Sequence, residues 1–206
     1  MATDRFAVLT DAAIDVLAEH GMRGLTHRAV DARAELALGT TSAYFRTRKA
    51  LIEAVVRRLA ELDRADLETD RLPAEAGAPA VDLGDPGAVA AGIAAVLDRW
   101  LSAGRTRTLA RFLCLLEATH HPELRTILAY GDVFRLQATA MLASAGVENP
   151  EQAGSHLVAC IDGLLFDRLA GAGSRTAPQP GTAASRDDLA TAVETLLRAF
   201  TATGSR

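Results

Sequence analysis

The sequence has few aromatic residues and no long apolar run. Aromatic residues make up 4% of its 206 positions, and alanine and leucine supply most of the apolar side chains. Because alanine and leucine favour helices whereas aromatic and β-branched residues favour strands, this composition predicts helices. The longest apolar run, residues 88–97, is ten residues long. A helix that spans a bilayer needs roughly twenty, so the sequence is not that of a membrane protein.

Cysteines are also scarce. The only two, Cys114 and Cys160, lack the spacing of a metal knuckle or a disulfide framework. The first residues lack the features of a signal peptide. Both observations predict a protein of the reducing cytoplasm. Apolar residues nevertheless make up 49% of the chain and charged residues 23%, so it has enough apolar surface for a core and is not wholly disordered.

Positive charge is concentrated in one segment of an acidic chain. The whole sequence has a formal net charge of −4. Residues 20–58, by contrast, contain 8 arginine and lysine residues against 3 aspartate and glutamate residues. A basic segment in an acidic protein indicates a local site for a polyanion such as nucleic acid. On charge alone, a solvated helix face is an equally good interpretation.

Apolar residues recur at spacings of three and four, which predicts an all-α fold of about nine helices without an internal repeat. Thr26 and Thr47 are predicted N-caps, and Gly21 is predicted to end the first helix. Ser185 is predicted to open the last one. The stretches at 73–84 and 171–185 are rich in small residues and are predicted to be loops, the second of them mobile. The predicted helices are 4–20, 26–33, 40–45, 48–71, 86–102, 105–119, 122–144, 150–170 and 186–203.

Residues 24–51 predict a helix-turn-helix, which consists of two short helices joined by a tight turn. The second helix must carry small or polar residues on its exposed face to enter the major groove of DNA. Residues 40–43, Thr-Thr-Ser-Ala, meet that need, and Gly39 suits the turn before them. Hydroxyl groups, basic side chains and helix N-termini nearby are typical contacts for phosphates.

With these elements in order, the segment resembles the DNA-binding domain of the TetR family of bacterial transcriptional regulators. The matching features are His-Gly after the first helix, then Gly-Leu-Thr, then Gly-Thr-Thr, then Tyr-Phe-x-x-Arg with Ala-Leu behind it. The resemblance covers about residues 4–62. One departure is Thr41-Ser42, where family members often have Leu-Tyr, so a tyrosine contact to phosphate is lost there.

The resemblance implies a sequence-specific DNA-binding regulator, a repressor that a small-molecule effector releases from its operator. The expected partners are a palindromic double-stranded operator, a second copy of the chain and an effector of unknown identity, with no cofactor, metal or catalytic residue. The expected domains are a DNA-binding domain at 1–47 with its motif at about 26–45, a connecting helix at 48–71, and an effector-binding and dimerisation domain at 72–206. The residues expected to contact DNA are Thr26, His27, Arg28, Gly39, Thr40, Thr41, Ser42, Tyr44, Arg48 and Lys49.

Two further sets of residues are predicted from the helices after residue 85. Apolar residues of the middle helices are candidates for an effector pocket: Trp100, Phe112, Leu116, Phe134 and Met141. A single helix-turn-helix buries too little surface to select one site in a genome, so a homodimer that reads two half-sites is expected. The last two helices are expected to form its interface through Leu157, Ile161, Leu164, Leu165, Leu189, Val193, Leu196 and Phe200, with Gly163 allowing close approach.

Two alternatives remain open at this point. In the first, the chain is an all-α enzyme or metal-binding bundle whose N-terminal helices only resemble the motif. Glu117 and His120 have the E-x-x-H spacing of di-metal bundles, but a second such motif is missing. Neither a Gly-x-Ser-x-Gly elbow nor a glycine-rich phosphate loop occurs. In the second alternative, the chain binds DNA constitutively and has no effector.

Overall fold

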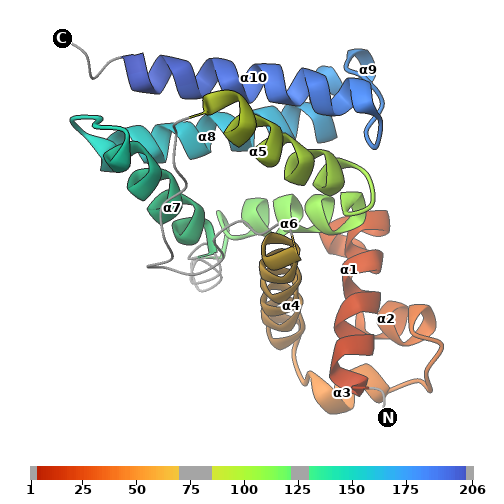
Figure 1. The fold of residues 1–206 in the computed structure, drawn as a ribbon. Coiled ribbons are helices and arrows are strands. Elements are labelled where there is room, and N and C mark those ends of the chain that lie inside the picture. The colour runs from red at the N-terminus through yellow and green to blue at the C-terminus, as the bar shows by residue number, and fades with distance from the viewer. Residues whose placement is uncertain (1–3, 70–84, 122–129, 203–206) are drawn as a thin grey trace. The chain divides into compact units, whose positions relative to one another are not determined.

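A computed structural model describes residues 4–69, 85–121 and 130–202, and every regular element in these ranges is a helix (Figure 1). The described residues form ten helices, against about nine predicted, and the additional one is a single turn. The prediction of an all-α fold is confirmed. Within the same ranges, each helix is too short or too polar to cross a lipid bilayer.

The chain divides into two compact units. The first unit comprises residues 1–64 and 106–129, and the second comprises residues 65–105 and 130–206. Residues 106–121 thus pack with the N-terminal helices although they follow the second unit's first helix in the chain. The domains expected from the sequence, at 1–47, 48–71 and 72–206, stay a prediction.

The first unit is built on α1, with α2 and α3 beside it and α4 and α6 completing the core. Thr26 and Thr47 are N-caps as predicted, because their hydroxyl oxygens accept hydrogen bonds from the N–H groups of Ala29 and Ala50 at 3.2 and 3.1 Å. Gly21 has a φ of +67° and a ψ of −177°, so the regular helical backbone of α1 is broken at this residue as predicted, and a further short turn extends the element to Gly24. The bounds are α1 (Arg5–Gly24), α2 (His27–Arg33), α3 (Thr40–Tyr44), α4 (Arg48–Thr69) and α6 (Arg105–Glu117).

The core of the first unit is formed by apolar side chains from α1, α2, α4 and α6. Burial raises the pKa of the Cys114 thiol to about 12, and the charge of Glu117 adds to the shift. Cys114 is therefore a small buried core residue, and its thiol is poorly suited to chemistry. The other members of this core include Leu9, Leu17, Leu25, Val30, Phe45, Leu51 and Val55.

In the second unit, α5 and α10 pack together and both contact α8, which also packs against α7. The predicted starts at Pro86 and Pro150 are confirmed, whereas the predicted start at residue 122 lies outside the described residues, as does the predicted loop at 73–84. The bounds are α5 (Pro86–Leu101), α7 (Tyr130–Ser144), α8 (Pro150–Leu169), α9 (Gly173–Thr176) and α10 (Ala183–Ala202).

The connection from α8 to α10 differs from the predicted mobile loop. It contains the short helix α9, and α10 begins at Ala183 with Thr182 accepting a hydrogen bond from the N–H of Ser185 at 3.2 Å. The prediction that Ser185 is the cap is therefore wrong. Ser185 is buried and donates its hydroxyl proton to the carboxylate of Asp98 at 2.6 Å. The same carboxylate accepts the N–H of Gly181 at 2.9 Å, so Asp98 fixes this connection to the end of α5.

Candidate DNA-binding site

The first unit contains a helix-turn-helix formed by α2, residues 34–39 and α3 (Figure 1). Gly39 directly precedes α3 and has a φ of +94°, a left-handed conformation that glycine adopts without steric cost. Gly39 is the N-cap residue of α3, and because it has no side chain it provides no capping group to the helix. The N–H groups at the start of α3 need another acceptor.

Asp31, near the end of α2, supplies that acceptor. Its carboxylate accepts hydrogen bonds from the N–H of Gly39 and the N–H of Thr41, both at 2.7 Å, and from the hydroxyl of Thr41 at 2.6 Å. Only 2% of Asp31 is exposed. The carboxylate thus joins α2 to the first turn of α3 and sets the direction in which α3 leaves the turn.

The hydrogen bonds to Asp31 also determine its ionisation. Burial by itself raises the pKa of this carboxyl group. The hydroxyl and N–H of Thr41, the N–H of Gly39 and the charge of nearby His27 together outweigh burial and hold the pKa below its ordinary value of 3.8. Asp31 is therefore a carboxylate at neutral pH, and its negative charge favours the N-terminal end of α3.

Thr41 lies in the interior and not on the exposed face where the sequence led us to place it. Its exposed fraction is 0%, and its hydroxyl group points to Asp31. Thr41 is therefore excluded from the residues that can face DNA in this conformation. It occupies the position where TetR-family proteins often have leucine, and its polar side chain is satisfied there by the buried carboxylate.

Two other residues expected to contact DNA have partners inside the protein. The carbonyl oxygen of Phe45 lies 2.7 Å from Nε2 of His27, and because a carbonyl only accepts, Nε2 is the donor. The guanidinium of Arg48 donates to the carbonyl oxygen of Met22 near the end of α1. These contacts hold the end of α3 against α2 and the start of α4 against α1. Both residues therefore position the motif, whatever they add on DNA.

The remaining candidates lie on or next to the motif and are open to solvent to different degrees. Thr40 is half-buried and its hydroxyl group donates to the carbonyl oxygen of Ala37 at 2.6 Å. Tyr44 is 50% exposed at the end of α3. The Nζ atom of Lys49 is 3.9 Å from the carboxylate of Glu53, a weak surface pair. The other exposed candidates are Thr26, Arg28, Gly39 and Ser42.

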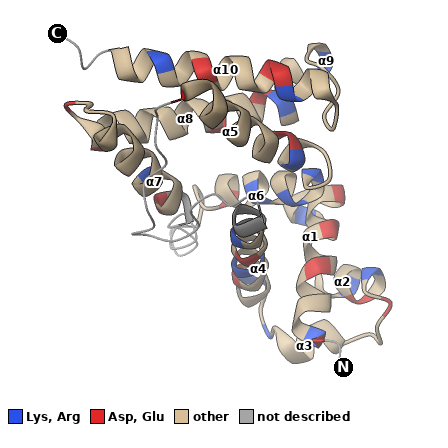
Figure 2. Ribbon diagram, in the orientation of Figure 1, with Lys and Arg blue, Asp and Glu red and all other residues tan. Residues whose placement is uncertain are grey.

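The arginines of the basic segment fall into two groups. Arg33 pairs with Asp15 and Glu19 of α1 at 3.0 and 3.3 Å, and Arg58 pairs with Asp11 of α1 at 2.8 Å. These two arginines therefore attach α2 and α4 to the acidic side of α1. Figure 2 shows basic residues on α2 and α4 and acidic residues along α1. The exposed arginines in residues 20–58 include Arg23, Arg28, Arg46 and Arg57.

The turn of the motif also contains a strained residue. Glu35 has a φ of +55°, a left-handed conformation that costs a side-chain-bearing residue about 1–2 kcal/mol. Glycine at this position would relieve the strain and stabilise the fold. Part of that gain is offset because glycine has a greater conformational entropy in the unfolded chain. We therefore expect Glu35→Gly to raise the free energy of unfolding by about 0.5–1 kcal/mol, measured by urea denaturation followed by circular dichroism.

Glu35→Ala is the matched control, because it removes the same carboxylate but keeps a Cβ in the left-handed region. We expect no gain for this variant. An equal gain from both substitutions would assign the effect to the charge of Glu35 and contradict the explanation from strain.

The residues proposed for an effector pocket divide between the two units. Trp100 and Phe134 belong to the second unit and pack edge to face, with ring centroids 5.8 Å apart, and Met141 is buried in the same unit. Phe112 and Leu116 lie on α6 in the first unit, and Leu116 is 59% exposed. Within the second unit, the structure brings the aromatic pair together.

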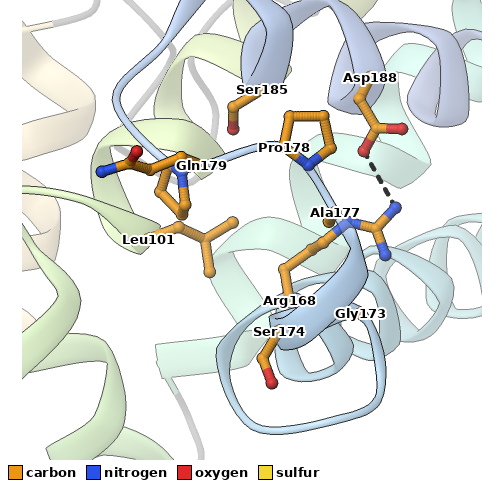
Figure 3. A pocket seen from close by; sticks show the side chains of 10 residues that line it. Leu101, Arg168, Gly173, Ser174, Ala177, Pro178, Gln179, Ser185 and Asp188 are labelled. Atoms are coloured by element: carbon orange, nitrogen blue, oxygen red, sulfur yellow. Dashed lines mark hydrogen bonds and ion pairs between the residues drawn. The ribbon is translucent and has the colours of Figure 1, made fainter.

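The second unit has a cavity at a different place, between the ends of α5 and α8, α9 and the start of α10 (Figure 3). Its volume is about 240 Å³, below the range of about 300–1,000 Å³ usual for ligand sites. Arg168 enters it and binds the carboxylates of Asp167 and Asp188 at 2.7 and 3.0 Å. Its lining consists of Leu101, Arg168, Gly173, Ser174, Ala177, Pro178, Gln179, Pro180, Ser185 and Asp188, which includes none of the five pocket candidates.

The predicted dimer contacts also need correction. Four of them are buried within the second unit, with exposed fractions of 0–1%, and pack in its core: Leu157, Leu165, Leu189 and Val193. The other four, Ile161, Leu164, Leu196 and Phe200, are half-buried. The sequence indicated apolar faces on these helices but could not distinguish the face that covers the protomer core from the face that meets a partner.

The metal-binding alternative gains no support from the part of the chain that the structure describes. Within it, no three His, Cys, Asp or Glu side chains lie close enough together to hold a metal ion. Glu117 lies 3.4 Å from His121, whereas His120, its partner in the E-x-x-H spacing, is exposed.

Comparison with known proteins agrees with the geometry of the motif. Residues 9–55 match the model of bacterial regulatory proteins of the tetR family, and residues 84–201 match that of the tetracycline-repressor-like C-terminal domain. No curated protein matches the chain.

Solved structures show similarity over nearly the whole chain. A transcriptional regulator from Rhodococcus sp. Rha1 is 23% identical, with 98% of both chains covered and a TM-score of 0.77. The multidrug binding protein EbrR in complex with imidazole is 27% identical, with 96% of both chains covered and a TM-score of 0.66. A TetR-family member from Streptomyces coelicolor A3 is 28% identical, with 92% of this chain and 98% of that chain covered and a TM-score of 0.64.

The two family models thus account for both parts of the chain, the helix-turn-helix that Asp31 organises and the helices that follow residue 84. The longer match covers more than half of the sequence. This chain is a member of the TetR family of DNA-binding bacterial transcriptional regulators.

Proposed function

We propose that the protein is a repressor of the cytoplasm that binds a palindromic operator as a homodimer, is released from it by a small molecule, and catalyses no reaction. The observation that carries this proposal is the helix-turn-helix itself. Its second helix, α3, is fixed by Asp31 and presents Ser42, Ala43 and Tyr44 outward. Small exposed residues let such a helix enter the major groove, where bases are read.

Phosphate contacts come from the residues around this face. Thr26 stands at the N-terminus of α2, and Lys49 lies in the first turn of α4, where N–H groups point outward. Tyr44 offers a phenolic hydroxyl at the end of α3. With Arg28, which we assign to base edges or phosphate, each protomer has three or four groups for phosphates. Phosphates carry no sequence information, so these groups set affinity and register.

A homodimer supplies the second half-site. We place its interface on the side of α8 that faces away from the protomer core, where Ala159, Cys160, Gly163 and Phe166 are exposed. These residues recur at spacings of one, three and three, so they share one helix face. The half-buried Leu196 and Phe200 of α10, which packs on α8, extend it. Packing of these helices across a two-fold axis buries apolar surface that is exposed in one protomer.

An effector is supported by the similar protein EbrR, whose structures contain imidazole, ethidium and malachite green. In this chain the apolar surface that such ligands use is supplied by the aromatic pair Trp100 and Phe134. Met141, which follows Phe134 on α7, adds to it. A ligand that binds the form unable to engage DNA more tightly shifts the population towards that form.

Salt dependence tests the proposed function. Lys49 and Arg28 are the charged residues among the proposed phosphate contacts, so if both contact phosphates the dimer neutralises about four phosphates, and log K should fall with log salt concentration with a slope of about −3 to −4. The measurement is fluorescence anisotropy on operator sequences selected from a random DNA pool. If the selection retains no DNA sequence at low salt, or if the slope is near zero, the proposal is contradicted and an enzyme or another helical bundle is favoured.

Single substitutions refine the same measurement. Lys49→Ala should reduce the magnitude of the slope by about 1–2, because one contact is lost in each protomer. Arg198→Ala is the matched control, since Arg198 is exposed on α10 and pairs only within its own helix with Glu194. Its slope should equal that of the unaltered protein.

A further inference from the structure

The turn before α3 exposes a large apolar side chain. Leu38 is 74% exposed, more than any other large hydrophobic residue that the structure describes. It directly precedes Gly39, the N-cap residue of α3, and therefore lies at the N-terminal end of that helix. An exposed leucine is common on protein surfaces, but this one lies where the motif meets the major groove.

The backbone that carries Leu38 is held on both sides. On one side, the carbonyl oxygen of Ala37 accepts hydrogen bonds from the N–H and the hydroxyl of Thr40 at 3.1 and 2.6 Å. On the other, the N–H of Gly39 donates to Asp31 at 2.7 Å. Leu38 is therefore presented in one fixed position, so little backbone entropy is lost when it meets a partner.

The residues around Leu38 offer few groups for reading bases by paired hydrogen bonds. Residues 37–45 contain no Asn, Gln, Asp, Glu, His, Lys or Arg. These are the side chains that form bidentate pairs with guanine or adenine or accept from cytosine. The hydroxyl groups of Thr40 and Thr41 are already donated to protein acceptors. Apart from the hydroxyl groups of Ser42 and Tyr44, the exposed side chains of residues 37–45 are apolar, and Leu38 is the largest aliphatic one among them.

The chemical partner for such a surface in the major groove is the 5-methyl group of thymine, the apolar group that a base displays there. We propose that Leu38 determines specificity by packing against a thymine methyl group in each operator half-site. This inference rests on the proposed function, because it requires that the motif bind DNA. It assigns the base class that the turn before α3 selects.

Replacement of thymine by uracil tests the proposal, because uracil differs from thymine only by lacking the methyl group. In a selected operator, each thymine is replaced by uracil in turn, symmetrically in both half-sites. We expect one position at which affinity falls about fourfold for each half-site, or about fifteenfold for the pair, the size of effect expected when one buried methyl-sized group is lost. Anisotropy titrations measure this loss.

The variant Leu38→Ala identifies the residue responsible. It should bind the thymine operator more weakly and should lose sensitivity to uracil at that one position, while Leu38→Met should keep the sensitivity. Leu136→Ala is the matched control, because Leu136 is an exposed leucine on α7 in the other unit. It should behave as the unaltered protein does.

The outcomes separate the inference from the proposed function. Selection that yields no operator defeats both. An operator that is bound equally well with uracil at every thymine position overturns the inference alone, as does full uracil sensitivity in Leu38→Ala. The uracil scan uses the unaltered protein, so its result stands even if a variant folds poorly.

Discussion

Asp31→Ala should abolish operator binding and lower the free energy of unfolding by about 3–5 kcal/mol. The substitution removes the acceptor of three hydrogen bonds and leaves the hydroxyl and N–H of Thr41 buried without a partner. Each buried donor left in this state costs about 1–3 kcal/mol. The first turn of α3 is then no longer held to α2. The residues of α3 and its turn that face DNA therefore lose their fixed arrangement. Urea denaturation and anisotropy titration measure the two effects.

A second substitution tests whether the pair acts as a unit. Thr41→Val removes the hydroxyl donor but keeps the side-chain shape. In the Asp31→Ala background, it should recover about 1 kcal/mol, because one of the unpaired donors is gone. Simple additivity of the two single substitutions would show that Asp31 and Thr41 are not coupled and would contradict the role assigned to the carboxylate.

The pH dependence of Asp31 has a definite sign. Its pKa in the folded state is lower than the ordinary value of 3.8, so its contribution to stability is complete above that value and is lost as the pH falls through the lower folded-state pKa. Asp31→Asn cannot lose a proton. It should be less stable than the unaltered protein at neutral pH, and the difference should shrink below about pH 4.

Gly163→Arg should convert the dimer into monomers and weaken operator binding by about 100-fold or more. Gly163 is exposed on α8, and a Cβ placed there meets no atom of the protomer within 4 Å. The protomer therefore has room for the new side chain, and a helix interior gains about 0.5–1 kcal/mol when glycine is replaced by a better helix former. A partner that packs closely on α8 has no such room, and each lone protomer then reaches only one half-site.

The matched control is Gly92→Arg. Gly92 lies within α5, is exposed, and also has no atom within 4 Å of a Cβ placed on it. This variant should remain a dimer with unchanged affinity. Light scattering distinguishes a protomer of 21.7 kDa from a species of twice that mass. A Gly163→Arg protein that remains dimeric and binds its operator normally would place the interface on another face.

The sequence was sufficient to predict the helices and the type of motif, because both depend on local signals. Thr26 and Thr47 accept the N–H groups that an N-cap is expected to accept. Gly39 adopts the left-handed conformation that a tight turn requires. These predictions depend only on neighbours within a few residues, and those neighbours are visible in the sequence.

The interactions that organise the candidate site were not predictable in the same way. Asp31 lies inside a helix, where an aspartate usually faces water, and its partners are eight and ten residues away. Thr41 was read as exposed because threonine is polar, but a buried acceptor reverses that preference. Ser185 has the spacing of a cap, yet its hydroxyl is directed to Asp98, 87 residues earlier in the chain. Each case depends on a tertiary partner that no local pattern reveals.

The hydrogen bonds of Asp98 have a consequence for protein engineering. The connection at residues 171–182 is rich in Gly, Ala and Pro, the composition normally chosen for inserting a reporter domain or placing new chain termini. Here, however, Gly181 and Ser185 both donate to a buried carboxylate on α5. Opening the chain at this point would disturb the hydrogen bonds to that carboxylate. The connection is therefore an ordered part of its unit and a poor place for an insertion or for new termini.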